Sequence, residues 1–131
     1  MAHEDDAAEW APVAPELFVP DVAEAARFYE QALGFRIVRL EPDFGIVALG
    51  QCVLMLADER MYGTMGGDAS GRRGELIDVR LVVPDVNVMY RRAKDHGVTI
   101  VHEIGDRPYG LRDFILRDAN GFRLRFASPL R

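Results

Sequence analysis

The sequence predicts an α+β protein made of two tandem modules, each with the order strand, helix, strand, strand, strand. Three observations lead to this prediction. The tetrapeptide Val-Pro-Asp-Val occurs at residues 19–22 and again at 83–86, about half the chain length apart. Each copy follows a short strand-like run and precedes a run of good helix formers. A glycine and three runs rich in β-forming residues follow each helical run.

In the first module, residues 15–19 (PELFV) form the first predicted strand. Asp21 then stands at the N-cap position of a helix over Val22–Leu33, and Glu24 follows three residues later, as in a capping box. Gly34 suits the left-handed residue that ends such a helix. The remaining strands are predicted at 35–41, 45–49 and 52–57.

The second module repeats this order of strand, capped helix, glycine and three strands. Residues 76–82 form its first strand, Asp85 takes the N-cap position, and a helix is predicted over Val86–His96 before Gly97. Its remaining strands are predicted at 98–103, 113–118 and 122–126.

The chain length fits one compact domain overall. Within it we expect a loose N-terminal arm at 1–12, the first module at 13–57, a connecting loop at 58–74 and the second module at 75–131. The loop is dense in glycine and charge, and it is long enough to cover a site.

Composition narrows the class of function. Acidic residues number 21 against 16 lysines and arginines, and the net charge of -5 argues against binding to nucleic acid. No apolar stretch approaches the roughly 20 residues that span a bilayer, so no membrane association is expected. A single cysteine excludes an internal disulfide. With no secretory signal visible at the start, the predicted location is the cytoplasm.

The last predicted strand, FRLRF at 122–126, alternates strictly. Leu124 and Phe126 lie on one face, which we expect to pack against the helices, and Arg123 and Arg125 lie on the other. The two arginines are therefore predicted to point away from the core.

Two phrases carry a family resemblance: FYEQALGF at 28–35 and RDANGF at 117–122. Together with the paired modules, they make the chain from about Ala14 to Ser128 resemble the vicinal oxygen chelate superfamily. This superfamily includes glyoxalase I, extradiol dioxygenases and bleomycin resistance proteins. The resemblance implies curled mixed sheets around a ligand cavity between the modules, often completed across a homodimer.

The resemblance also implies four metal-ligand positions, which in this chain read Ala14, Met55, Asp78 and Arg125. Of these side chains, only the Asp78 carboxylate suits a divalent cation, and the guanidinium of Arg125 would repel it. We therefore predict no metal ion and no other cofactor. Asp78 and Arg125 are expected to form a bidentate ion pair in place of the metal.

The leading hypothesis is a metal-free, homodimeric binding protein, similar to the bleomycin resistance branch, that sequesters a drug or metabolite of unknown identity. No residue is assigned a catalytic role. The acidic composition favours a cationic ligand, whereas arginines that face the ligand cavity favour an acidic one. The predicted ligand-binding residues are Glu16, Phe18, Met55, Asp78, Arg80, Tyr109 and Arg125.

Three other interpretations stay open. The charged residues could simply satisfy one another as structural ion pairs. The protein could instead be a metal-dependent lyase, isomerase or dioxygenase with non-standard ligands, for which His102, Glu103 and Asp78 are the candidates. It could also be a protein-interaction module whose cavity is vestigial.

Overall fold

The computed structural model describes residues 6–131. The chain divides between Arg72 and Arg73 into two compact units, which we describe separately. No helix within residues 6–131 is long and apolar enough to cross a membrane.

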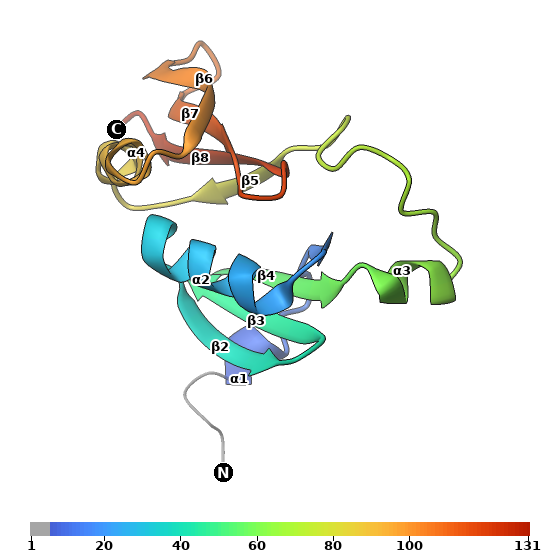
Figure 1. The fold of residues 1–131 in the computed structure, drawn as a ribbon. Helices are drawn as coiled ribbons and strands as arrows, with labels where there is room; N and C mark the ends of the chain where they lie inside the picture. The colour runs from blue at the N-terminus through green and yellow to red at the C-terminus, as the bar shows by residue number, and fades with distance from the viewer. Residues whose placement is uncertain (1–5) are drawn as a thin grey trace. The chain divides into compact units, whose positions relative to one another are not determined.

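The first unit contains one long helix and a four-stranded mixed sheet (Figure 1). The strands lie in the order β1-β4-β3-β2. Strand β1 is parallel to β4, and the other neighbouring pairs are antiparallel. The elements are β1 (Glu16–Val19), α2 (Val22–Leu33), β2 (Arg36–Glu41), β3 (Phe44–Leu49) and β4 (Cys52–Asp58).

The second unit repeats this arrangement. Its strands lie in the order β5-β8-β7-β6, again with one parallel pair, β5 with β8. The elements are β5 (Val79–Val82), α4 (Val86–Asp95), β6 (Thr99–Asp106), β7 (Leu111–Arg117) and β8 (Arg123–Pro129). The two strand-helix-three-strand units confirm the predicted α+β fold class.

Aspartate caps begin both long helices at the predicted positions. A side-chain oxygen of Asp21 accepts a hydrogen bond from the Glu24 N–H at 3.0 Å, and one of Asp85 accepts from the Asn87 N–H at 3.0 Å. Helix α2 ends at Gly34, whose φ of 78° is left-handed. Each repeated tetrapeptide therefore lies at the junction of a strand and a helix and supplies the cap of the helix.

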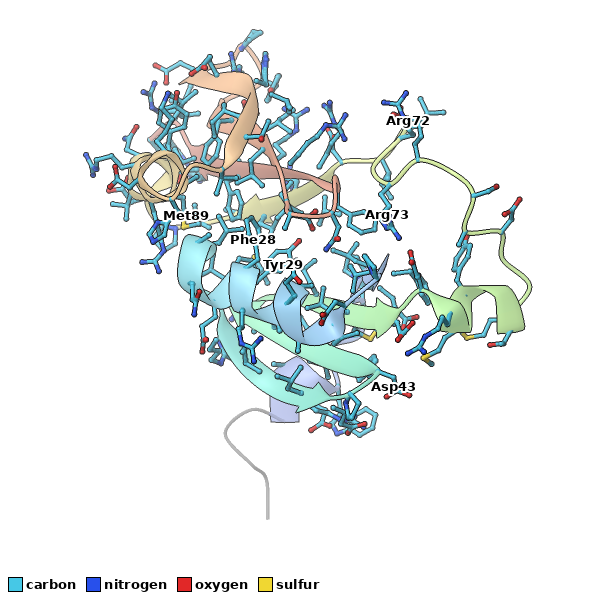
Figure 2. The ribbon with its side chains drawn as sticks, in the orientation of Figure 1. Phe28, Tyr29, Asp43, Arg72, Arg73 and Met89 are labelled. Atoms are coloured by element: carbon cyan, nitrogen blue, oxygen red, sulfur yellow. The ribbon has the colours of Figure 1, made fainter. Side chains whose placement is uncertain are left out.

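The core of the first unit lies between α2 and its sheet. Tyr29 (Figure 2) is the largest of the fully buried side chains among the described residues. Its ring meets that of Phe35 edge-on at a centroid distance of 5.1 Å. The small residues Ala25 and Ala26 are also buried, which lets α2 approach the sheet closely.

The core of the second unit centres on two stacked phenylalanines. The rings of Phe114 on β7 and Phe126 on β8 lie 5.7 Å apart, and Tyr90 of α4 meets Phe114 edge-on at 5.0 Å. Met89 is buried on the same helix (Figure 2). The hydroxyl of Ser128 accepts a hydrogen bond from the Val86 N–H at 2.9 Å, which ties the end of β8 to the start of α4.

Two short helices extend the predicted pattern. Helix α1 (Asp6–Glu9) contacts β2 and β3 on the face of the first sheet away from α2 (Figure 1), and Glu9 forms an ion pair with Arg39 at 3.1 Å. The first five residues of the predicted arm lie outside the described range. Helix α3 (Arg60–Thr64) lies in the predicted connecting loop.

Candidate functional site

The candidate site is a shallow hollow on the second sheet. We call the sheet face away from the long helix the open face. Leu124 and Phe126 are buried toward α4, so Arg123 and Arg125 lie on the open face, as the alternation of FRLRF predicts. The hollow has a volume of about 460 Å³, and its lining residues are Asp78, Arg80, Tyr109, Leu111 and Arg125.

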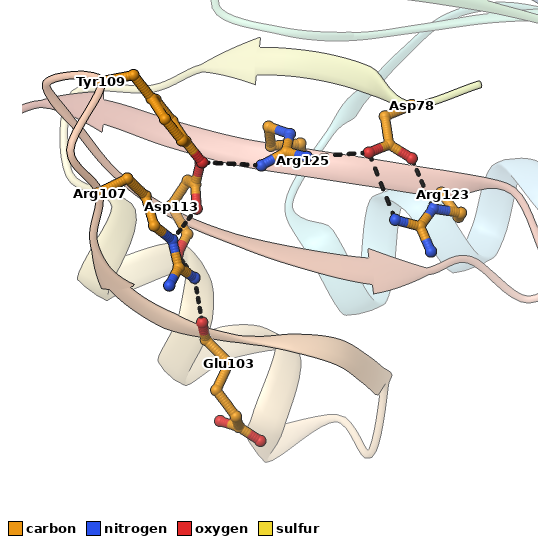
Figure 3. Close-up of polar contacts among 7 residues, drawn as sticks. All are labelled: Asp78, Glu103, Arg107, Tyr109, Asp113, Arg123 and Arg125. Atoms are coloured by element: carbon orange, nitrogen blue, oxygen red, sulfur yellow. Dashed lines mark hydrogen bonds and ion pairs between the residues drawn. The ribbon is translucent and has the colours of Figure 1, made fainter. Parts of the chain in front are cut away.

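Asp78, which immediately precedes β5, binds two arginines of β8 (Figure 3). The Nη2 of Arg125 donates to Oδ2 of Asp78 at 3.1 Å. Arg123 makes the bidentate contact, with its Nε 2.5 Å from Oδ1 and its Nη2 3.4 Å from Oδ2. The prediction of a bidentate Asp78–Arg125 pair is therefore wrong in its partner: Arg125 makes only a single contact because its other amino group reaches a second carboxylate.

That second carboxylate belongs to Asp113 on β7, a residue with 0 % of its surface exposed. It accepts hydrogen bonds from Arg107 Nε at 2.7 Å, from the hydroxyl of Tyr109 at 2.6 Å and from Arg125 Nη1 at 3.1 Å. The Nη1 of Arg125 also donates to the Tyr109 oxygen at 3.1 Å (Figure 3). Arg125 therefore bridges two aspartates.

These contacts shift the pKa values of the carboxyl groups. Hydrogen bonds from Arg123 are the main reason that the pKa of Asp78 is below its ordinary value. Burial alone would raise the pKa of Asp113, but the three hydrogen bonds that it accepts outweigh burial and lower it. In the first unit, hydrogen bonds from Arg60 lower the pKa of Asp58 to about 2. All three aspartates are ionised at neutral pH.

Acidification is expected to destabilise the fold. Because all three pKa values are lower in the folded chain than in the unfolded chain, the unfolded chain binds more protons as the pH falls. The stabilisation is complete above the ordinary aspartate pKa of about 4 and is lost as the pH falls towards about 2. Urea unfolding followed by circular dichroism from about pH 7 to about pH 2 measures this loss. A midpoint that stays constant below about pH 4 would contradict it.

The structure brings the predicted ligand-binding residues together in two groups. Asp78, Arg80, Tyr109 and Arg125 line the hollow of the second unit. The others, Glu16, Phe18 and Met55, belong to the first unit. There Glu16 and Met55 are register partners on β1 and β4. The ring of Phe18 packs on Tyr62 of α3 at a centroid distance of 4.7 Å.

The four positions at which the resemblance implies metal ligands also pair within each unit. The Met55 N–H donates at 2.8 Å to the carbonyl of Pro15, the residue after Ala14, and Asp78 pairs with Arg125. These side chains do not fit a divalent metal ion. Ala14 has no donor atom, the Met55 thioether is a soft ligand, and the Asp78 carboxylate is shared between two guanidiniums.

The side chains of the alternative metal-ligand set do not lie close together either. His102 and Glu103 lie on β6, which the sheet order separates from β5 by two strands, or roughly 14 Å at the usual strand spacing. Glu103 accepts a hydrogen bond from the Tyr90 hydroxyl. Within residues 6–131, no group of three or more histidine, cysteine, aspartate or glutamate side chains is placed to hold a metal ion.

Sequence reasoning missed Asp113 and Arg107. A signal for Asp113 was available, because it alternates with the buried Phe114 on β7 and so falls on the same open face as Arg125. Arg107 gives no such signal. It lies in the turn between β6 and β7, where its N–H donates to the Leu111 carbonyl at 2.7 Å, and strand periodicity does not place turn residues.

A family model for the Glyoxalase/Bleomycin resistance protein/Dioxygenase superfamily matches residues 11–126. The chain belongs to this superfamily. An uncharacterized protein of Mycobacterium bovis is 28% identical over an alignment of 129 residues, and the match covers 91% of this chain and 84% of that relative.

Solved structures show the same superfamily fold. TioX from Micromonospora sp. ML1 has a TM-score of 0.71 at 24% identity, and the match covers 88% of this chain and 94% of TioX. A glyoxalase/bleomycin resistance protein/dioxygenase from Nocardioides has a TM-score of 0.71 at 18% identity, covering 92% of this chain and 85% of that one. At these identities the likeness establishes the fold alone.

Proposed function

We propose that the protein binds a small molecule in the hollow on the open face of its second sheet, without a metal ion. The observation that carries this proposal is the position of Arg125. It stands where the resemblance implies a metal ligand, and two aspartates hold its guanidinium there. A fixed positive charge at this place disfavours a cation and leaves a polar surface on which a ligand can bind.

The hollow has the size and lining of a ligand site. Its volume of about 460 Å³ lies within the range of roughly 300–1,000 Å³ that is typical of small-molecule pockets. It combines an apolar side chain, Leu111, and an aromatic ring, Tyr109, with charged groups whose positions are fixed by ion pairs. Such fixed polar groups favour affinity because binding does not require them to be ordered.

The first sheet differs from the second because its open face is partly covered. Tyr62 of α3 packs on Phe18, and α1 lies against β2 and β3, so elements of the same unit already contact its open face. We therefore assign ligand binding to the second sheet.

Two measurements test the proposal. Metal analysis of protein purified without chelator should find no stoichiometric nickel, zinc, iron or manganese. A thermal-shift screen of antibiotics and small metabolites should find compounds that raise the melting temperature. A compound at one hundred times its dissociation constant would stabilise the native state by about 2.7 kcal/mol, or roughly 10 °C for a domain of this size.

Two variants test whether the compounds bind in the hollow. Leu111→Trp should fill the hollow and abolish the shift, whereas Val88→Trp, on the exposed surface of α4, should leave it unchanged. A stoichiometric metal ion would overturn the proposal in favour of a lyase, isomerase or dioxygenase. Stabilisation by a protein partner and by no small molecule would indicate an interaction module.

A further inference from the structure

We propose that the hollow binds molecules that carry a carboxylate, or another singly charged anion, beside an apolar group, and that Arg80 binds the anion. This inference rests on the function proposed above, because it names the chemical class of ligand for the same site.

Arg80 differs from the other arginines of the open face. Arg125 bridges two aspartates, and Arg123 is paired with Asp78. Among residues 6–131, the side chain of Arg80 makes no hydrogen bond or ion pair, although it lines the hollow. It is therefore the arginine in the hollow whose donors are available to a ligand. A guanidinium presents its N–H groups in a planar fork that matches a carboxylate.

The strand register strengthens this assignment. Arg80 on β5 is the direct register partner of Arg125 on β8, so two guanidinium side chains start from adjacent strands on one face. Like charges placed opposite each other are destabilising unless counter-ions neutralise them. The aspartates neutralise Arg125 but leave Arg80 without a counter-ion. A bound anion would supply the counter-ion that Arg80 lacks.

The same contacts disfavour a cationic ligand. Asp113 is wholly buried and already accepts three side-chain hydrogen bonds, and Asp78 is shared between two arginines. A ligand ammonium group would have to displace a guanidinium from one of these carboxylates. The net charge of -5 does not reverse this preference, because charges beyond the Debye length of about 8 Å are largely screened.

The apolar part of the ligand follows from the remaining lining. The hydroxyl of Tyr109 is occupied by Asp113 and Arg125, so Tyr109 offers its ring, and the residue is 58% exposed. Leu111 adds an aliphatic side chain next to it. An aromatic or aliphatic group can cover this ring while its anionic end reaches Arg80.

Calorimetric titration of the full chain with three probes tests the inference. The probes share a naphthalene ring: 2-naphthoate, its neutral amide, and 2-naphthylmethylammonium. We expect the carboxylate to bind about tenfold more tightly than the amide, and the ammonium to bind most weakly. In Arg80→Gln the advantage of the carboxylate should disappear, and in Arg80→Lys it should persist in part. Arg91→Gln, an exposed position on α4, is the matched control and should keep the full difference.

The outcomes separate this inference from the proposed function. Amide or ammonium binding as tight as that of the carboxylate overturns the anion preference and leaves binding in the hollow intact. Carboxylate binding that Arg80→Gln does not weaken overturns the role of Arg80. If no probe binds, the inference fails, and the wider screen with Leu111→Trp decides whether the proposed function fails with it. Because the Arg80 side chain makes no hydrogen bond or ion pair with the described residues, its variants should melt at the wild-type temperature.

Discussion

Replacing Asp113 with alanine is expected to lower the free energy of unfolding by about 3 kcal/mol. The carboxylate is wholly buried and accepts hydrogen bonds from Arg107, Tyr109 and Arg125. Its removal leaves Arg107 without its counter-ion and leaves Arg125 with Asp78 alone, in a partly buried place. Because both arginines keep some contact with water, the loss should lie near the lower end of that for a broken buried ion pair.

Urea unfolding of wild type and Asp113→Ala measures this difference. Asp106→Ala is the matched control, since Asp106 pairs with Arg112 in the same unit but has a side chain that is 62% exposed. An exposed ion pair contributes less than about 1 kcal/mol, so this control should stay near wild-type stability. Equal losses in the two variants would show that the Asp113 contacts are no stronger than surface ion pairs.

Gly74→Ala should be the second strongly destabilising change, with an expected loss of about 2–4 kcal/mol. Gly74 has a φ of 82°, a left-handed conformation that costs an L-residue about 1 kcal/mol. In addition, a Cβ at this position would lie 2.4 Å from the carbonyl oxygen of Gly121. Because that oxygen belongs to the backbone and already accepts a hydrogen bond from Arg117, the contact is not easily relieved.

Gly66→Ala separates the two contributions to this loss. Gly66 has a φ of 90°, close to that of Gly74, but a Cβ added there would meet nothing within 4 Å. It should therefore show only the conformational cost, about 1 kcal/mol or less. Thermal unfolding of both variants makes the comparison. If the two lose the same stability, the turn at Gly121 does not pack against Gly74 as described.

Local chemistry explains why so much of the fold could be predicted. Each repeated tetrapeptide places a proline and a capping aspartate between a strand and a helix, and these mark where the strand ends and the helix begins. The strand periodicity then placed Arg123 and Arg125 on the open face. Such features depend on neighbouring residues, so the sequence alone reveals them.

The partners within the site depend on contacts between distant residues, which is why they were harder to predict. Whether Arg123 or Arg125 makes the bidentate contact with Asp78 depends on a second acceptor, Asp113, on a strand reached through a different turn. The short helices α1 and α3 were missed for a related reason. With 4 and 5 residues they are too short to show a helical period, and they contact the first sheet instead.

Glu16 and Arg80 occupy equivalent positions on the first strands of the two repeated units, and they carry opposite charges. The buried residues on the helix side hold each scaffold together, while the side chains of the open face contribute less to folding when they lack partners. Gene duplication can thus supply a second copy of the folded unit. Substitutions on the open face of that copy can alter ligand recognition at little cost to the stability of its core. A designer could use the same separation by exchanging open-face residues and leaving the interior untouched.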